Sequence, residues 1–192
     1  MTTKRYKTGV IHGRFQVLHK DHLKYLQSGM ELCQHLVVGI TNPAPAQSKP
    51  ESSDANRGQA AANPLTYFER YTLLRATLID AGLTFDQFSV VPFPINYPER
   101  YQYYVPMDAT FFLTIYDNWG RQKLDYFKSQ GLTVHILRDV TPEEKGISAS
   151  AVRSLMIEDK NWEDFTPKAV TILLKSWDVP SRLKTLKKME DS

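Results

Sequence analysis

The sequence predicts an α/β fold, with a doubly wound parallel sheet followed by a C-terminal helical segment. Apolar stretches with β-branched residues recur between residues 6 and 138, and helical patterns separate them. This alternation is typical of a parallel sheet covered by helices. The expected strands are almost continuously hydrophobic, as strands buried on both faces usually are. After residue 147 only helical patterns remain.

Each predicted element follows from its own pattern. Short runs rich in Val, Ile, Phe and Thr predict strands at 6–12, 35–41, 88–93, 109–115 and 132–138. Apolar residues at helical spacing predict helices at 21–33, 65–82 and 119–130. In the C-terminal part, Ser148 is a suitable N-cap for one helix, and Thr166 followed by Pro167 is expected to open another.

The composition is that of an ordinary globular protein. Of the 192 residues, 42% are hydrophobic and 23% are charged, which fits one domain of usual size. The apolar runs fall far short of the roughly 18 residues that a membrane span needs, and the polar N-terminal start lacks a signal-peptide core. We therefore expect a single domain over 1–192, a cytoplasmic location and no membrane partner.

Charge and cysteine content exclude some further classes. The net charge of +3 is small, and much of the basic excess lies in the tail 181–192, which we expect to be a solvated, partly helical end. This gives no argument for a nucleic-acid partner. The single cysteine, Cys33, excludes an internal disulfide and a cysteine-rich zinc site, and we expect it in the core, on the apolar side of helix 21–33.

Residues 43–63 interrupt the alternation of strands and helices. They are rich in Pro, Ala, Ser and Asn, with almost no large apolar side chain. Such a segment is either disordered or a mobile flap over an active site, in which case Lys49 and Arg57 are suited to closing over an anion. We treat it as a flexible insertion, and 148–192 as a C-terminal helical part of the same domain.

The first cluster of chemically active residues lies where the first strand passes into the first helix. Ligands of parallel α/β sheets collect beyond the carboxyl ends of the strands, where helix N-termini offer free N–H groups to phosphate. Arg14 adds a permanent charge, and His19 and His22 are one helical step apart. These residues predict a polyphosphate site, although a pair of histidines at this spacing also fits an ordinary helix start. The chain has no GxxxxGK[ST] or GxGxxG motif.

A second cluster follows the last predicted strand. Ser148 and Ser150 place hydroxyl groups at a helix start, and Arg153 follows one turn later. Hydroxyls, free N–H groups and a guanidinium together favour an anion, while the same residues taken alone also fit a simple capped helix.

Together the two clusters resemble the nucleotidyltransferase superfamily that carries a His-x-Gly-His motif and an Ile-Ser-x-Thr-x-x-Arg motif. Within it, "GRFQVLHKDH" is most similar to the "GRFQPxHxGH" opening of archaeal-type nicotinamide mononucleotide adenylyltransferases, and "NPLTYFER" (63–70) resembles their "NPFTxxER". The resemblance implies a Rossmann-like sheet and transfer of a nucleotidyl group, with Mg²⁺ as the cofactor and release of pyrophosphate. The protein itself is not expected to supply a metal site.

The resemblance also implies roles for individual residues. His19, His22 and Arg153 would be catalytic, because they bind the triphosphate and stabilise the transition state. The remaining residues of the two motifs and of the loop after the fourth strand would bind the nucleotide: Gly13, Arg14, Phe15, Gln16, Asp21, Asn118, Ile147, Ser148 and Ser150. Tyrosines in place of the family's stacking Trp, together with one arginine, would bind the acceptor: Tyr97, Tyr101, Tyr104 and Arg121. Aromatic residues at this helical spacing also fit simple packing in the core.

The departures from the family pattern leave the substrates open. Asp21 stands where the family has a glycine that leaves room for the base, so its side chain reshapes the base pocket or is simply tolerated in the first helical turn. The leading hypothesis is transfer from ATP to nicotinamide or nicotinate mononucleotide. The alternative, favoured by Asp21 and the missing Trp, is a cytidylyltransferase that uses CTP and a small phosphate or phosphonate. A third hypothesis is a nucleotide sensor without catalysis. A homo-oligomer is compatible with all three.

Overall fold

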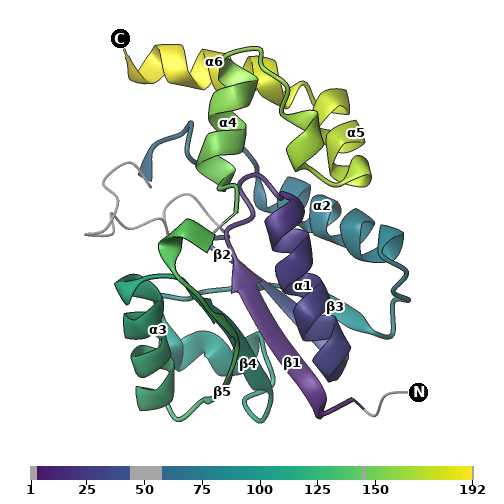
Figure 1. The fold of residues 1–192 in the computed structure, drawn as a ribbon, viewed down its shortest axis with the longest axis vertical. Coiled ribbons are helices and arrows are strands. Elements are labelled where there is room, and N and C mark those ends of the chain that lie inside the picture. Colours follow the sequence, from purple (N-terminus) through teal and green to yellow (C-terminus); the bar gives the residue numbers. More distant parts are fainter. Residues whose placement is uncertain (1–3, 44–57, 145, 192) are drawn as a thin grey trace. The chain divides into compact units, whose positions relative to one another are not determined.

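The computed structural model describes residues 4–43, 58–144 and 146–191. They form two compact units (Figure 1). The first unit contains the described parts of 1–13, 24–41 and 83–146, and the second contains those of 14–23, 42–82 and 147–192. Most of the predicted insertion 43–63, with Lys49 and Arg57, lies outside the described residues.

The first unit contains a five-stranded sheet in which every pairing is parallel, as the alternation of patterns predicts. The strand order is β3-β2-β1-β4-β5, so the chain reverses its direction across the sheet between β1 and β4. In open α/β sheets this switch point is where ligands bind. The strand bounds are β1 Tyr6–Gly13, β2 Cys33–Thr41, β3 Phe88–Phe93, β4 Thr110–Ile115 and β5 Thr133–Asp139.

Two helices cover opposite faces of this sheet. Successive strand residues point to opposite faces; Ile11 faces α1 (Lys20–Leu32), whereas Val10 packs in the same cluster as Phe127 of α3 (Asn118–Ser129). The approach of α1 is close, because a Cβ on Gly29 would lie 2.6 Å from Cδ1 of Ile11. Glycine at this position lets the helix approach the strand, and the sheet is doubly wound as predicted.

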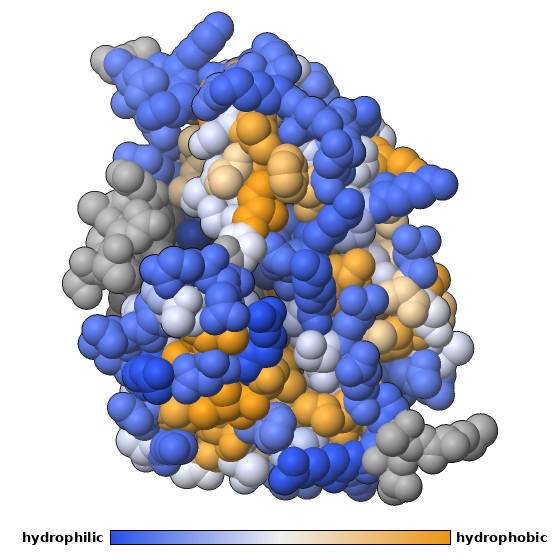
Figure 2. All heavy atoms as spheres, viewed as in Figure 1, coloured by the Kyte–Doolittle hydropathy of each residue, from blue (hydrophilic) through white to orange (hydrophobic). Residues whose placement is uncertain are grey.

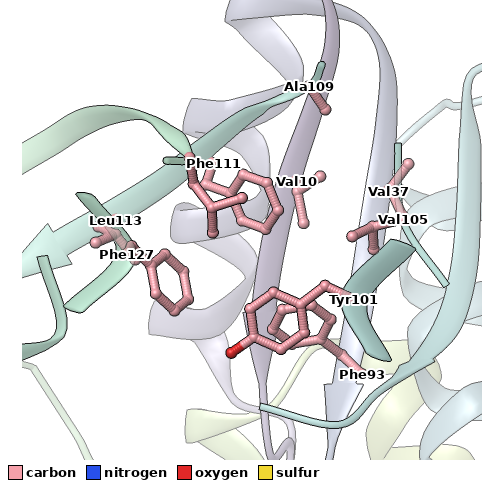
Figure 3. Packing of buried hydrophobic residues seen from close by; sticks show 10 residues of the cluster. Val10, Val37, Phe93, Tyr101, Val105, Ala109, Phe111, Leu113 and Phe127 are labelled. Atoms are coloured by element: carbon pink, nitrogen blue, oxygen red, sulfur yellow. The ribbon is translucent and has the colours of Figure 1, made fainter. Parts of the chain in front are cut away.

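The core on the α3 side of the sheet combines aliphatic residues with the rings of Phe93, Tyr101, Phe111 and Phe127 (Figure 3). The Phe93 and Tyr101 rings have centroids 4.5 Å apart, and Phe111 meets Phe127 edge-on at 5.6 Å. Tyr101 comes from a short 3-10 helix, η3 (Pro98–Tyr103), that the sequence analysis did not predict. Edge-to-face and offset contacts of this kind add to the free energy gained from burial alone.

The edge strand β5 is the least covered part of the sheet. Ile136 is 37% exposed, and Figure 2 shows apolar surface, in orange, around this strand. Arg138 and Asp139, which are both exposed, place charges at the end of the strand, and such charges discourage pairing with another edge. Within the part of the chain that the structure describes, no helix has both the length and the hydropathy needed to cross a membrane.

The described residues of the second unit form helices and loops. Helix α5 packs against α2, and α6 packs against both α4 and α5. The basic tail 181–192 was expected to be a solvated, partly helical end; it is helical up to Glu190 and largely exposed, but its Leu183 is fully buried, as is Val179 at the start of α6. Val179 and Leu183 are four positions apart, so they lie on the same face of α6. This apolar face packs against α4 and α5. The α-helical bounds are α2 Tyr67–Asp80, α4 Ala149–Ile157, α5 Lys168–Ser176 and α6 Val179–Glu190.

Two local predictions differ from the structure. Cys33 is buried as expected, but it is the first residue of β2 and not part of a helix, because α1 ends at Leu32 and passes directly into the strand. Thr166 was expected to be the N-cap of α5 and Pro167 its first helical residue. Pro167 is the N-cap instead, and Thr166 is the C-cap of the short η5 helix (Glu163–Phe165). The Thr166 hydroxyl donates to the Glu163 carbonyl, and α5 has no side-chain cap bond.

Candidate active site

The loop between β1 and α1 has a strained backbone at Phe15. Its φ angle of 53° lies in the left-handed region, which costs a residue other than glycine about 1–3 kcal/mol and persists only where surrounding contacts enforce it. The Phe15 side chain is buried, and its ring meets His22 edge-on with centroids 5.1 Å apart. The loop therefore has one defined shape, which fixes the start of α1.

His19 and His22 form a stacked pair at the start of α1. Their ring centroids lie 3.8 Å apart, with an angle of 27° between the ring planes. The backbone N–H of each residue points at Nδ1 of the other, with N to N distances of 3.4 Å. Since Nδ1 accepts in this geometry, the N–H of each ring that faces away from the pair is on Nε2. The pair thus holds two Nε2–H donors in a fixed relation.

The electrostatic surroundings keep His22 neutral. Burial lowers the pKa of His22 well below its usual value, and the nearby charges of His19 and Arg14 lower it further. A polyphosphate anion has the opposite effect, because an anion close to an imidazole stabilises the protonated form. The permanent positive charge near the helix start therefore comes from Arg14, while His22 is neutral. His22 is suited to taking up a proton when an anion binds.

The second cluster joins the first within the second unit. Oγ of Ser148 accepts the backbone N–H of Ala151 at 3.1 Å and caps α4, as predicted. Arg153 is almost completely buried; it donates to the Gln16 carbonyl from Nη1 and to Ser150 Oγ from Nη2, the latter at 3.1 Å. The starts of α1 and α4, which are far apart in the sequence, are therefore linked through Arg153 and Gln16. Ile147 lies directly before the cap and is half-buried.

Two side chains expected to bind the nucleotide point elsewhere. Gln16 is buried, and its side-chain amide donates to the Leu65 carbonyl at 2.8 Å and accepts the Leu65 N–H at 2.9 Å. Phe15 is buried against His22. Both side chains hold the loop in place in this structure, and their expected part in nucleotide binding stays a prediction. Gly13 ends β1 in the first unit, and Arg14 and Asp21 are half-buried in the second.

The residues expected to bind the acceptor belong to the first unit. Tyr101 is a core residue: its ring is fully buried and its hydroxyl donates to the Ile95 carbonyl at 2.5 Å, so it offers no open face for stacking. Tyr97 lies under the Arg100 guanidinium, 5.1 Å from the ring centroid. Tyr104 is 39% exposed.

The loop after β4 differs in part from its predicted role. Arg121 forms a paired contact with Asp139, with N to O distances of 3.1 and 3.4 Å, so its expected acceptor contact would require it to leave an ion pair. Asn118 is exposed at the first position of α3, directly after the N-cap Asp117.

Arg70 was not predicted from the sequence as a site residue. It is buried in α2 and donates to the carbonyls of Arg14 and Asn42 at 3.1 and 2.9 Å. Burial lowers its pKa to about 10, so it stays charged at neutral pH. A signal was present in the sequence: Arg70 shares the helical stripe of the buried Leu73, Leu74 and Thr77. A charged residue in an apolar stripe indicates a buried contact that the fold requires.

Comparisons with known sequences agree with this arrangement. A profile of the family described as Cytidylyltransferase-like matches residues 10–155. The phosphonoformate cytidylyltransferase of Streptomyces viridochromogenes is 43% identical over 177 residues, which cover 92% of this chain and 95% of that protein. The nicotinamide-nucleotide adenylyltransferases of Thermococcus sibiricus and Pyrococcus horikoshii are 27% and 28% identical, each over 93% of this chain and 88% of their own length.

Solved structures agree at the level of the fold. A bifunctional NMN adenylyltransferase/ADP ribose pyrophosphatase from Francisella tularensis matches with a TM-score of 0.66 and 16% identity, covering 94% of this chain and 53% of that one. The profile spans the sheet and both clusters of polar residues, and the relatives match along most of their length. This chain is therefore a nucleotidyltransferase that belongs to the cytidylyltransferase-like family.

Proposed function

We propose that the protein transfers CMP from CTP to a small phosphonate or phosphate acceptor and releases pyrophosphate. The observation that carries this proposal is the 43% identity to a phosphonoformate cytidylyltransferase, against 25–28% for the nicotinamide-nucleotide adenylyltransferases. The sequence-based preference for ATP and a pyridine mononucleotide is accordingly replaced by its alternative. A phosphonate that also carries a carboxylate, such as phosphonoformate, is the acceptor class to test first.

Asp21 is the second reason for proposing CTP as the donor. Asp21 occupies the first turn of α1, between His19 and His22, where the superfamily motif has glycine. A side chain at this place takes up room next to the helix start, and a pyrimidine needs less room than a purine. A carboxylate can also accept a hydrogen bond from an exocyclic amino group such as that of cytosine.

The reaction needs positioning and charge stabilisation more than covalent help from the protein. An oxygen of the acceptor attacks the α-phosphorus of CTP, and the bond from that phosphorus to the bridging oxygen of the β-phosphate breaks. Pyrophosphate leaves with the electron pair. The Nε2–H groups of His19 and His22, and the free N–H groups at the start of α1, are suited to stabilising the charge on the phosphoryl oxygens. The start of α4, with Ser148 and Ser150, is suited to the β- and γ-phosphates.

We propose that Mg²⁺ enters with the triphosphate and neutralises part of its charge. Among the described residues, no group of three or more His, Cys, Asp or Glu side chains is arranged to hold a metal ion. Mg²⁺ keeps several waters and is commonly held by substrate phosphates with few protein ligands. The residues present therefore fit a metal that is bound mainly by the substrate.

The experiment is a matrix of donors and acceptors. The purified protein is incubated with Mg²⁺ and either CTP, ATP, GTP or UTP, each with phosphonoformate, other small phosphonates, small phosphate esters or nicotinamide mononucleotide, and pyrophosphate release is followed. We expect turnover with CTP and a small phosphonate. Turnover with ATP and nicotinamide mononucleotide, and none with CTP, would reject the proposal in favour of dinucleotide synthesis. Tight triphosphate binding without turnover for any acceptor would favour a sensor.

A further inference from the structure

The strained loop at Phe15 is held on both sides by buried arginines. Arg70 donates to the carbonyl of Arg14, directly before Phe15, at 3.1 Å. Arg153 donates to the carbonyl of Gln16, directly after it. Both guanidinium groups are almost completely buried, with 2% and 7% exposure. Hydrogen bonds from a charged donor are stronger than those between neutral groups, so these two contacts help to enforce the left-handed conformation.

A third contact holds the same loop from the side-chain amide of Gln16. Its Nε2 donates to the Leu65 carbonyl at 2.8 Å, and its Oε1 accepts the Leu65 N–H at 2.9 Å. The amide thus pairs with the backbone of Leu65 as a neighbouring strand would. Both residues are 3% exposed, and loss of either bond would leave a buried polar group without its partner.

The segment that receives Gln16 is in turn fixed from α6. We call residues Asn63–Thr66 the brace. Arg182 donates to the Pro64 carbonyl at 3.0 Å and forms an ion pair with Glu69 at 2.8 Å. Glu69 accepts the Thr66 N–H at 2.8 Å and completes the capping box of α2. All of these residues belong to the second unit. A continuous series of hydrogen bonds therefore leads from α6 through the brace to Gln16.

We infer that Gln16 is a positioning residue of the triphosphate site, and that Arg182 acts on the same site through the brace. This rests on the proposed use of a nucleoside triphosphate at the starts of α1 and α4. Both polar atoms of the Gln16 amide are engaged by the Leu65 backbone. Gln16 sets the loop that presents Arg14 and the first turn of α1, and its carbonyl fixes the guanidinium of Arg153.

The test uses substitutions that remove hydrogen bonds while keeping side-chain length. Gln16→Met removes both bonds to Leu65. Arg182→Met removes the bond to Pro64, and Arg182→Lys keeps a charged donor at that place. The matched control is Lys184→Met on the same helix, because Lys184 pairs with Asp159, which lies outside the brace. Thermal unfolding of each variant sets an assay temperature at which every protein is folded.

The probe is inorganic tripolyphosphate with Mg²⁺, which has neither a base nor an acceptor, and its binding is measured by calorimetry. A misplacement of about 1 Å can cost a factor on the order of 10² at a preorganised site, so we expect Gln16→Met to weaken binding at least about tenfold. Arg182→Met should weaken it about threefold to tenfold, as is usual for indirect coupling. Arg182→Lys should recover part of the loss, and Lys184→Met should bind normally.

Two further measurements distinguish positioning from general stabilisation. In the variants Gln16→Met and Arg182→Met, amide hydrogen exchange should increase in residues 14–19, while in Lys184→Met it should not. The Gln16→Met and Arg182→Met effects on tripolyphosphate affinity should be less than additive in the double variant, because both act through the brace. In turnover assays the KM for CTP should rise, whereas the KM for the acceptor should not change.

Normal tripolyphosphate affinity in folded Gln16→Met protein would overturn the inference. If that variant does not fold, Arg182→Met decides in its place, and normal affinity there has the same consequence. The inference also fails if the unaltered protein does not bind tripolyphosphate. Failure of the proposed function is recognised separately: the protein would then bind tripolyphosphate with the expected variant effects but would not turn over CTP with any acceptor.

Discussion

The rings of His19 and His22 stack with their centroids 3.8 Å apart, and Nδ1 of each faces the backbone N–H of the other. This mutual arrangement fixes the tautomer of both rings at once. It also means that neither histidine can turn without disturbing the other. The pair is a preorganised double donor at the start of a helix, where an anion is already favoured by the free N–H groups.

The first prediction concerns the chemical step. We expect His22→Ala to lower kcat with CTP by a factor on the order of 10² or more, because it removes a preorganised donor to the transition state. Single-turnover formation of pyrophosphate measures this step. His35→Ala is the control, since His35 bonds to Asp86 and Ser89 in the first unit. A normal rate for His22→Ala in a folded protein would remove His22 from the mechanism.

The second prediction concerns proton uptake on binding. Burial and the charges of His19 and Arg14 lower the pKa of His22 in the free protein, so His22 is neutral at pH 7. A bound triphosphate raises that pKa, so binding takes up protons at pH values between the free and the bound pKa of His22, and this contribution strengthens binding as the pH falls through that interval.

Calorimetry in buffers of different ionisation enthalpy measures the protons taken up with tripolyphosphate. The ligand has its own titration in this range, and a comparison with His22→Asn cancels it. We expect the variant to take up fewer protons than the unaltered protein. Equal uptake in both would mean that His22 does not gain a proton when the anion binds.

The third prediction concerns Asp21 and the donor base. Replacing Asp21 by Gly restores the room that the superfamily motif has next to the helix start, so we expect the preference for CTP over ATP to decrease. The measurement is the ratio of kcat/KM for the two nucleotides. Asp21→Asn separates size from charge, because it keeps the volume of the side chain. If the ratio is the same in all three proteins, Asp21 has no part in choosing the base.

The sequence predicted the parts of this molecule that depend on local patterns. The strand before Gly13, the helix after it and the Ser148 cap each follow from residues within a few positions of one another. The contact between Gln16 and Leu65 joins segments 49 residues apart, and no local periodicity records it. For the same reason the sequence did not reveal that the side-chain amide of Gln16 bonds to the brace at Leu65.

The aromatic residues illustrate a second limit. Tyr101 and Tyr104 stand close together in the sequence, yet Tyr101 is fully buried and Tyr104 is 39% exposed. The difference depends on how η3 turns against Phe93, which is a property of the packed first unit. Arg70 is the opposite case, since its place in an apolar helical stripe was visible in the sequence and indicated burial.

The fourth prediction concerns His12, the buried residue just before Gly13. Its ring lies 5.5 Å from that of Phe93 and 5.2 Å from that of Phe127, and neither ring nitrogen has a hydrogen-bond partner among the described residues. Burial lowers the pKa of His12 well below its usual value, with a smaller effect from Lys123. The folded protein therefore keeps His12 neutral at pH values at which the unfolded chain takes up a proton.

The sign of the effect on stability follows from this difference. As the pH falls below about 6.5, His12 takes up a proton in the unfolded state but stays neutral in the folded state. The free energy of unfolding therefore decreases, by at most about 1.4 kcal/mol per pH unit, until the pH reaches the pKa of His12 in the folded state. His12→Phe should remove this part of the pH dependence and leave the contributions of the other histidines. Denaturant unfolding of both proteins between about pH 7.5 and pH 5 measures it. If the free energy of unfolding depends on pH in the same way in both proteins, His12 does not stay neutral in the fold. A histidine leaves this pH dependence unchanged only if its proton affinity is the same in the folded and unfolded states.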